Sequence, residues 1–546
     1  MRSLAAVLVC CIFACTLLAQ QNETTSNPPN SKKAAKAQPA KTSETPAKPA
    51  EPSPEAAKPE PGVAETEKDK EEHFDVTEVP PVVTHHQVTL NGKTLSYTAT
   101  TGRLPVKRAD GKIEAEMFFV AYTLDGQQAG KRPLTFAFNG GPGSATVWLH
   151  MGVLGPRHVM MQQPEGSLPA APYHIEDNPN TLLDKSDLVM VDAIGTGFSR
   201  AGTPELFHKF WGVKGDIESF GEFIRLYLTR YERWSSPLFL LGESYGTTRA
   251  AGISGYLADH GISFNGITLL SIALSFETLE DNKTNDLPFP LLIPTFTMIA
   301  GYHHKLPPDL AADMAKAREE SEHWAANDYT LALAKGDSLT PEERQKIIDE
   351  MSRLTGLNKD VIDQANLRIN VEKFTHYLLL DQKLRVGRLD GRFAGPDPDG
   401  TLDTPFYDPT MSTIVPPYTA VFNNYVRTEL GYKTDMPYYV FAEDAGFEKW
   451  DWGPSGRGFP DTATALREAM IKNPYLKVLV LEGHYDLATP YFAAEYTMDH
   501  LDLSPKYRAN ISFNFFEAGH MVYLPAEGEK KMKNDVASFM QKAGAE

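Results

Sequence analysis

Cysteine is nearly absent from this sequence. Only three cysteines occur in 546 residues, and all of them, Cys10, Cys11 and Cys15, lie close to the N-terminus. The rest of the chain cannot form disulfides of its own, so its fold has to be stabilised by packing and polar contacts rather than by a disulfide framework.

Basic residues are also fewer than acidic residues. Lys and Arg together number 53 against 71 for Asp and Glu, which gives a formal net charge of -18 at pH 7. Nucleic-acid binding depends on clustered Lys and Arg that displace counterions from phosphates. The composition therefore argues against a nucleic-acid partner.

The common metal and phosphate motifs are missing as well. No H-E-x-x-H segment occurs, and the histidine pairs at 85–86 and 303–304 are adjacent, which is not a metal-ligand spacing. The glycine-rich run at 139–144 lacks the Lys-Ser/Thr continuation of a P-loop. We expect neither a metal nor any other cofactor.

The apolar run from Leu4 to Leu18 is too short for a comfortable membrane span. With its positively charged start it predicts an export signal over residues 1–19, removed near Ala19. An alternative is that Ile12-Phe-Ala-Cys15 resembles a bacterial lipobox, so that a lipidated Cys15 would tether the protein to a membrane. Either pattern predicts export to the periplasm or cell envelope, and the lack of disulfides favours a bacterial source.

Residues 20–75 are rich in Pro, Ala, Lys, Glu, Ser and Thr, with few large apolar side chains. A segment of this composition cannot bury enough apolar surface to offset the entropy of ordering. We expect it to be a disordered linker.

Strand patterns begin after this linker. Residues 86–101 and 115–124 alternate apolar and polar side chains, as antiparallel strands with one buried face do. Later apolar runs without alternation are typical of parallel strands that are buried on both faces. These runs occupy residues 133–138, 187–191, 237–241, 266–274, 476–481 and 511–516.

Residues 276–460 interrupt the series of strands with helical patterns. Thr340-Pro-Glu-Glu343 is a capping box with proline at the first helical position. One helix face is expected from Leu310, Ala311, Met314 and Ala317. We predict an α/β-hydrolase fold, in which residues 76–275 and 461–546 form a mostly parallel central sheet with its helices and 276–460 is a largely helical cap insertion.

The segment Gly242-Glu-Ser-Tyr-Gly246 follows an apolar run and precedes a helix-compatible stretch. This is the G-x-S-x-G nucleophile elbow in its strand–turn–helix context, which holds a serine hydroxyl at the end of the sheet. A structural turn is the alternative interpretation, because small residues cluster in many turns. The context favours Ser244 as the nucleophile of a serine hydrolase.

In this fold the acid and the base follow the nucleophile along the chain. The strand at 476–481 runs into a loop with Asp486, and the strand at 511–516 runs into a loop with His520. His520 would take the proton of Ser244, and Asp486 would orient the imidazole. His484 is an alternative base, and Glu482 or Asp192 is an alternative acid.

An oxyanion hole requires two further backbone donors. Asn139-Gly-Gly-Pro-Gly-Ser144 follows the strand that ends at Phe138, which is where the fold supplies one donor. The residue after the nucleophile supplies the other. We expect the N–H groups of Gly141 and Tyr245 to bind the oxyanion.

Five segments together resemble the serine carboxypeptidase family, relatives of carboxypeptidase Y and of the plant and lysosomal enzymes. They occur in the family's order and are Asn139-Gly-Gly-Pro-Gly143, Asp192-Ala-Ile-Gly-Thr-Gly-Phe-Ser199, Gly242-Glu-Ser-Tyr-Gly246, the loop at Asp486 and Gly519-His520-Met521. The resemblance runs from about residue 130 to the C-terminus, except in the cap. It implies the triad of Ser244, Asp486 and His520.

The resemblance also implies that Asn139 and Glu243 bind the free C-terminal carboxylate of a peptide substrate. A glutamate facing a carboxylate would repel it unless the two share a proton, so we expect activity to be favoured at acidic pH. Ala137 and Ser144 stand where the family usually has Trp and Cys, so pocket shape and residue preference are not carried over.

These features predict an exported serine carboxypeptidase that acts on peptides with a free C-terminal carboxylate. An esterase, acyltransferase or lyase on the same scaffold is an alternative, although such an enzyme needs no carboxylate clamp. A non-catalytic envelope binding protein is an alternative from another class.

Overall fold

The computed structural model describes residues 74–282, 284–398, 400, 407–442, 449–453 and 459–544. The predictions of an export signal at 1–19, of lipidation at Cys15 and of nearly all of the linker at 20–75 lie outside these residues. Among the residues described, no helix is both long and apolar enough to cross a membrane.

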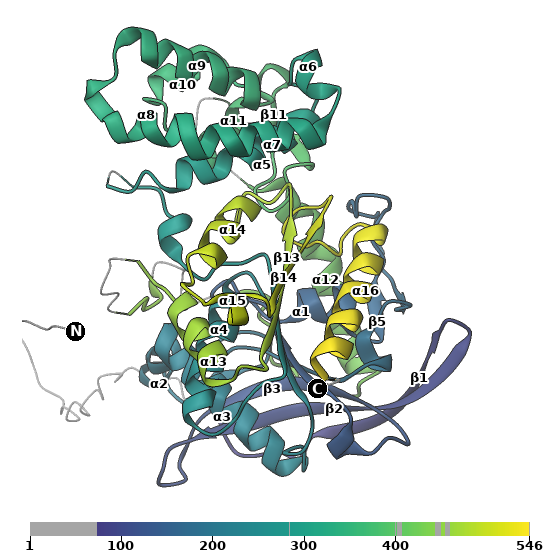
Figure 1. Cartoon of the computed structure of the whole chain (residues 1–546). Helices are drawn as coiled ribbons and strands as arrows, with labels where there is room; N and C mark the ends of the chain where they lie inside the picture. The colour runs from purple at the N-terminus through teal and green to yellow at the C-terminus, as the bar shows by residue number, and fades with distance from the viewer. Residues whose placement is uncertain are drawn as a thin grey trace, which may run out of the picture. The chain divides into compact units, whose positions relative to one another are not determined.

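A sheet of ten strands forms the centre of the protein, in the order β1-β2-β3-β7-β4-β9-β10-β13-β14, with β8 paired to β3 (Figure 1). Its antiparallel part consists of β1 (Val82–Leu90), β2 (Lys93–Lys107), β3 (Ile113–Leu124) and β8 (Arg200–Ala201). The expectation of strand over 86–101 was wrong in one respect, because a two-residue turn at Asn91-Gly92 divides it into β1 and β2. Both turn residues have positive φ, at 48° and 76°, as a tight hairpin requires.

The remaining six strands are parallel to one another. They are β4 (Leu134–Phe138), β7 (Asp187–Val191), β9 (Leu238–Glu243), β10 (Gly266–Leu270), β13 (Lys477–Gly483) and β14 (Ile511–Phe516). Every residue of β4, β7, β9 and β10 is buried, which explains their unbroken apolar runs. The strand expected at 266–274 ends at Leu270, because Ser271 turns the chain with φ 55°.

Helices cover both faces of the parallel strands (Figure 1). Since side chains alternate along a strand, Leu240 contributes to the hydrophobic cluster on one face and Leu241 to the cluster on the other. The cluster with Leu240 contains side chains from α3 (Val213–Arg230), α4 (Tyr245–Asp259), α13 (Ala463–Lys472) and α14 (Tyr491–Asp499). The cluster with Leu241 contains side chains from α1 (Val147–Leu149), α12 (Pro409–Thr428) and α16 (Ala526–Gly544). The mostly parallel sheet between these helix layers confirms the predicted α/β-hydrolase fold.

The insertion between β10 and β13 divides into two parts. Residues 289–386 form a separate hydrophobic cluster, joined by Tyr485 and Leu487 of the loop after β13, whereas the following α12 packs into the core of the sheet. The elements of the first part are α5 (Pro288–Tyr302), α6 (Pro308–Ala311), α7 (Met314–Trp324), α8 (Thr330–Lys335), α9 (Pro341–Thr355), α10 (Lys359–Gln364), α11 (Val371–Tyr377) and the strand β11 (Leu384–Val386), which pairs with β12 (Ala394–Pro396). Shorter elements elsewhere are β5 (Arg157–Val159), β6 (Ile175–Asp177), α2 (Pro204–Phe210) and α15 (Pro505–Arg508).

Two local predictions in the insertion have different outcomes. The capping box at Thr340 is confirmed, since the Thr340 hydroxyl accepts from the N–H of Glu343 and the Glu343 carboxylate accepts from the N–H of Thr340. The single helix face from Leu310 to Ala317 was wrong. Asp313 adopts an extended conformation and caps the start of α7, so that α6 and α7 are separate helices.

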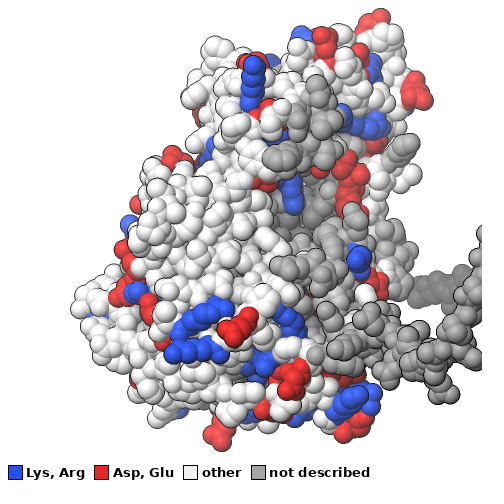
Figure 2. All heavy atoms as spheres, turned by 180° about the vertical axis from the view of Figure 1, so that it is seen from behind, with Lys and Arg blue, Asp and Glu red and all other residues white. Residues whose placement is uncertain are grey.

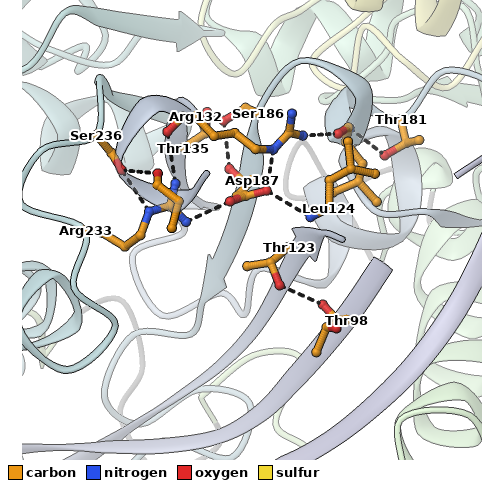
Figure 3. Close-up of polar contacts among 12 residues, drawn as sticks. Thr98, Thr123, Leu124, Arg132, Thr135, Thr181, Ser186, Asp187, Arg233 and Ser236 are labelled. Carbon is orange, nitrogen blue, oxygen red and sulfur yellow. Dashed lines mark hydrogen bonds and ion pairs between the residues drawn. The ribbon is translucent and has the colours of Figure 1, made fainter. Parts of the chain in front are cut away.

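A buried ion cluster lies at the start of β7 (Figure 3). Asp187 accepts hydrogen bonds from Arg132 at 2.6 Å and from Arg233 at 2.7 Å, and all three side chains are almost entirely buried. The N–H of Leu124 also donates to Asp187, at 3.0 Å. Because β7 begins here, the cluster stabilises the end of the sheet opposite to the carboxyl ends of the parallel strands.

On the face shown in Figure 2, acidic and basic side chains are intermixed. Several of the ion pairs are exposed, including the pair of Arg108 with Asp110 and that of Lys472 with Asp259. Exposed pairs of this kind contribute little to stability. The fold therefore depends on its apolar layers and on the few buried polar clusters.

Candidate active site

Ser244 lies at the turn between β9 and α4 with φ 60° and ψ -131°, a conformation that costs energy for any residue other than glycine. Its N–H donates to the carbonyl oxygen of Leu270 at 2.9 Å, which ties the turn to β10. Gly242 and Gly246 are required because a side chain at either position would collide with a neighbouring backbone carbonyl group. A Cβ atom on Gly242 would lie 2.2 Å from the carbonyl oxygen of Gly246, and a Cβ atom on Gly246 would lie 2.7 Å from that of Phe138.

His520 and Asp486 form a buried pair on the loops after β14 and β13. Nδ1 of His520 donates to Oδ2 of Asp486 at 2.7 Å. The same carboxylate accepts from the Thr489 hydroxyl at 2.6 Å and from the N–H groups of Ala488 and Thr489 at 2.8 and 3.1 Å. These bonds fix the carboxylate and the imidazole ring, and they leave Nε2 of His520 available for a proton from another group.

The charge state of His520 depends on its neighbours. Burial opposes the imidazolium, but the Asp486 carboxylate and the charge of Glu243 outweigh it and raise the pKa of His520 above its usual value. A histidine of this kind is a strong proton acceptor, and the carboxylate beside it stabilises the imidazolium that results.

The backbone of the His520 loop is held by two groups outside the loop. The Ser271 hydroxyl donates to the carbonyl oxygen of His520 at 2.8 Å, and the N–H of His520 donates to the carbonyl oxygen of Leu389 at 2.6 Å. Sequence reasoning missed both residues. Ser271 follows β10 directly, and a polar residue at the carboxyl end of a buried strand is the signal that could have found it.

A cavity of about 190 Å³ brings the predicted residues together at the carboxyl ends of the strands. It is lined by Ser244, His520, Asn139, Gly141 and Glu243. The rest of its wall is mostly apolar and is formed by Gly140, Ser144, Trp148, Arg388, Leu389, Met411, Ile414, Phe441 and Met521.

The loop at 139–143 packs directly against the turn that carries Ser244. A Cβ atom on Gly140 would lie 2.4 Å from the backbone nitrogens of both Tyr245 and Gly246, and Gly141 has φ 107°, which favours glycine. The N–H of Tyr245 belongs to the first turn of α4, where N–H groups have no acceptor within the helix. Gly141 and Tyr245 therefore lie on two backbone segments that meet beside Ser244.

A buried arginine holds this loop in place. Arg249, on α4, donates to the carbonyl oxygen of Asn139 at 2.5 Å. Its guanidinium is bound by Asp216 of α3 at 2.8 and 3.1 Å, and both side chains are almost completely buried. Sequence reasoning missed Arg249 and Asp216. The helix after Ser244 consists mostly of small and apolar residues, and a charged residue early in such a helix is an unusual feature that could have drawn attention to Arg249.

Glu243 precedes Ser244 and is only 3% exposed. The hydroxyl of Tyr523 donates to its Oε2 at 2.7 Å. Burial raises the pKa of Glu243 to about 7, while His520, Tyr523 and Asn139 act in the opposite direction. Below neutral pH this carboxyl is therefore largely protonated and is a hydrogen-bond donor at the wall of the cavity.

Asn139 lies at the end of β4, and its Oδ1 accepts from the N–H of Leu149 at 3.0 Å. That bond orients the amide with its oxygen toward the backbone of α1. An amide held in this way can offer its NH₂ group to an acceptor elsewhere.

The alternative acids and base have other partners. His484 bonds to Glu517 at 2.8 Å through Nδ1 and to Arg318 at 2.8 Å through Nε2. Glu482 accepts from the N–H of Ile272 at 2.9 Å, and Asp192 accepts from that of Thr146 at 2.7 Å. Of the candidate acids, Asp486 is the one that bonds to Nδ1 of His520, at 2.7 Å, and the Thr489 hydroxyl also lies 3.2 Å from that nitrogen.

A model of the serine carboxypeptidase family matches residues 91–520, which is most of the chain. The chain belongs to the serine carboxypeptidase family. It is thus a hydrolase of the serine carboxypeptidase type, a family whose substrates are peptides. The matched range contains the loop at 139–143, the turn at Ser244, Asp486 and His520.

Comparison with curated proteins gives no match. Among solved structures, a thermostable carboxyl esterase from Bacillus coagulans is 11% identical with a TM-score of 0.35, covering 81% of this chain and 99% of its own. A putative aryl esterase from Burkholderia cenocepacia is 12% identical with a TM-score of 0.32, covering 81% of this chain and 100% of its own. A lipase in its open form is 11% identical with a TM-score of 0.33, covering 82% and 100%.

Proposed function

We propose that the protein is an exported carboxypeptidase that hydrolyses the C-terminal peptide bond of peptides, with Ser244, His520 and Asp486 as its triad. The observation that carries this proposal is Glu243, a buried carboxyl beside Ser244 with a pKa of about 7. In its neutral form it donates a hydrogen bond to a substrate carboxylate. An esterase has no need of such a group.

In the first half of the reaction, Oγ of Ser244 attacks the carbonyl carbon of the scissile peptide bond, and Nε2 of His520 takes the hydroxyl proton. The pair of electrons from the C=O bond moves to the oxygen, which the N–H groups of Gly141 and Tyr245 stabilise. The C–N bond then breaks, His520 returns the proton to the leaving amine, and the C-terminal residue departs as a free amino acid.

In the second half, a water molecule attacks the acyl-enzyme ester and gives its proton to His520. The ester bond breaks, Ser244 regains its proton from His520, and the shortened peptide leaves with a new C-terminal carboxylate. Asp486 holds the tautomer of His520 and stabilises the imidazolium in both halves without taking the proton itself.

The substrate's own C-terminal carboxylate is bound by Asn139 and Glu243. Both line the cavity that contains Ser244, and a protonated Glu243 shares its proton with the carboxylate rather than repelling it. When Glu243 ionises, the two negative charges repel. This supports a binding of peptide acids that is favoured at acidic pH and declines as the pH rises through about 7, while the raised pKa of His520 sets the lower pH limit of activity, because a protonated imidazole cannot accept the Ser244 proton.

The proposed export rests on the N-terminal pattern alone. Mass spectrometry of the mature N-terminus tests it, since a chain that begins after Ala19 indicates simple signal cleavage and a lipid mass on Cys15 indicates a tether. An N-terminus that still carries residues 1–19 in the purified cellular protein contradicts export.

The enzymatic proposal is tested by release of free amino acid from an N-blocked dipeptide, run beside its C-terminal amide and with Ser244→Ala. We expect release of the free amino acid from the acid, weaker release of the amino-acid amide from the C-terminal amide at acidic pH, and neither product with the variant. If only ester substrates are cleaved while a fluorophosphonate still labels Ser244, the proposal is wrong and an esterase or acyltransferase takes its place.

A further inference from the structure

A short loop of the insertion, residues 387–393 between β11 and β12, is bound to both loops of the proposed triad. The carbonyl oxygen of Arg388 accepts from the N–H of Leu487 at 3.0 Å, one residue after Asp486. The carbonyl oxygen of Leu389 accepts from His520 at 2.6 Å, and Oδ2 of Asp390 accepts from the N–H of Gly519 at 3.0 Å. The backbone of this loop is therefore fixed relative to the reacting groups.

The side chain of Arg388 lines the same cavity as Ser244 and His520 and is exposed. It makes no hydrogen bond or ion pair to any residue in the part of the chain that the structure describes. Arg392 in the same loop is different, because it is paired with Asp390 and also donates to the carbonyl oxygen of Glu517 at 2.8 Å. Among the described residues Arg388 thus has no charged partner, and the hydrogen bonds of its loop hold its backbone beside the site.

The surroundings of Arg388 define the group that it can bind. Apart from the groups assigned above to catalysis and to the substrate's carboxylate, the described wall is mainly apolar, with Trp148, Leu389, Met411, Ile414, Phe441 and Met521. Among the described residues that line the cavity, Arg388 is the only Lys or Arg. A guanidinium in such a place favours a planar carboxylate, to which it can donate two parallel hydrogen bonds.

We propose that Arg388 binds the acidic side chain of an Asp or Glu next to the scissile bond, so that the enzyme prefers peptides with an acidic residue in their C-terminal dipeptide. This inference rests on the proposed carboxypeptidase function, in which Asn139 and Glu243 take the substrate's α-carboxylate. The substrate then has a second carboxylate, and Arg388 is the group in the cavity that can neutralise it.

The test uses two pairs of N-blocked dipeptides, one with Glu or Gln at the C-terminal position and one with Glu or Gln at the preceding position. For each, kcat/KM is measured with the wild type, Arg388→Met, Arg388→Lys and Arg344→Gln. The last is a control that removes one positive charge from the insertion at an arginine bound to Asp363, away from the cavity. Since Glu and Gln differ little in size, the Glu-to-Gln ratio isolates the charge.

We expect a preference for Glu of roughly tenfold to a hundredfold in one of the two pairs, the worth of a charge-assisted hydrogen bond. The ratio falls to about one in Arg388→Met, is partly kept in Arg388→Lys and is unchanged in Arg344→Gln. No preference in either pair, or a preference that survives in Arg388→Met, overturns the proposal. An equal loss for Glu and Gln in Arg388→Met also overturns it, because Arg388 would then bind the α-carboxylate.

If the wild type cleaves no dipeptide acid, the carboxypeptidase function fails and Arg388 is tested separately. The same dipeptides are then used to protect Ser244 from labelling by a fluorophosphonate. Stronger protection by Glu than by Gln in the wild type, lost in Arg388→Met, supports the role of Arg388. Equal protection by the two dipeptides contradicts it.

Discussion

The hydroxyl of Tyr523 donates a 2.7 Å hydrogen bond to Oε2 of Glu243. Tyr523 comes three residues after His520, and Glu243 comes one residue before Ser244. The group proposed to bind the substrate's carboxylate is thus held by the same loop that carries the proposed base. This coupling gives the first prediction.

Tyr523→Phe should move the alkaline limit of activity to higher pH. The Tyr523 hydrogen bond favours the ionised form of Glu243 and so lowers its pKa, and its loss raises a pKa that is already about 7. Because Glu243 must be protonated to bind a carboxylate, the fall in kcat/KM for peptide acids should shift upward by about half to one pH unit. The pH profile of kcat/KM measures this, and a shift to lower pH would show that the assigned direction is wrong.

Replacing Arg249 by Met should impair both stability and turnover. The change leaves Asp216 buried without its partner, at a cost of about 3–5 kcal/mol in the free energy of unfolding. It also releases the carbonyl oxygen of Asn139 and with it the loop at 139–143, which is proposed to bind the oxyanion. We expect kcat to fall by about a hundredfold, as when one oxyanion donor is lost.

Asp187→Ala is the matched control for Arg249→Met. It also breaks a buried ion cluster, here with Arg132 and Arg233, at the opposite end of the sheet (Figure 3). Urea unfolding should show a loss of about 3–5 kcal/mol. Below the melting temperature kcat should stay within about twofold of the wild type, and a large drop would mean that damage to any buried ion pair is enough to disable the site.

Gly140→Ala should inactivate the enzyme with little effect on the rest of the fold. A Cβ atom at Gly140 would lie 2.4 Å from the nitrogens of Tyr245 and Gly246, so the two backbone segments beside Ser244 would have to move apart. A displacement of about 1 Å in the groups around the reacting atoms costs about a hundredfold or more in kcat. Gly544→Ala, where a Cβ atom meets nothing within 4 Å, is the control that should leave kcat unchanged.

The parts of the fold and site that depend on local chemistry could be predicted from the sequence. Ser244 stands in a motif whose first glycine, Gly242, is required by a contact with Gly246 only four residues away, and the parallel strands are recognisable as apolar runs. Asp486 and His520 were singled out because they follow such strands. The structure places these two in hydrogen-bond contact and brings Ser244 and His520 to one cavity.

The groups that hold this arrangement could not be predicted, because their partners are far away in the sequence. Asp216 and Arg249 are 33 residues apart, and Leu389 contacts His520 from inside the insertion. The helix face expected from Leu310 to Ala317 failed for a local reason. Hydrophobic spacing continues across Asp313, but the side chain of Asp313 caps a new helix and breaks the old one.

The measurement that tests the account most directly is the ratio of kcat/KM for an N-blocked dipeptide to that for its C-terminal amide, followed across pH. It is measured for the wild type and for Glu243→Gln, whose amide donates a hydrogen bond at every pH but cannot ionise. The account predicts that the wild-type ratio falls as the pH rises through about 7, when Glu243 loses its proton, and that the ratio of the variant stays flat. A wild-type ratio that does not change with pH, or the same decline in both proteins, would contradict the proposal that Glu243 binds the substrate's carboxylate.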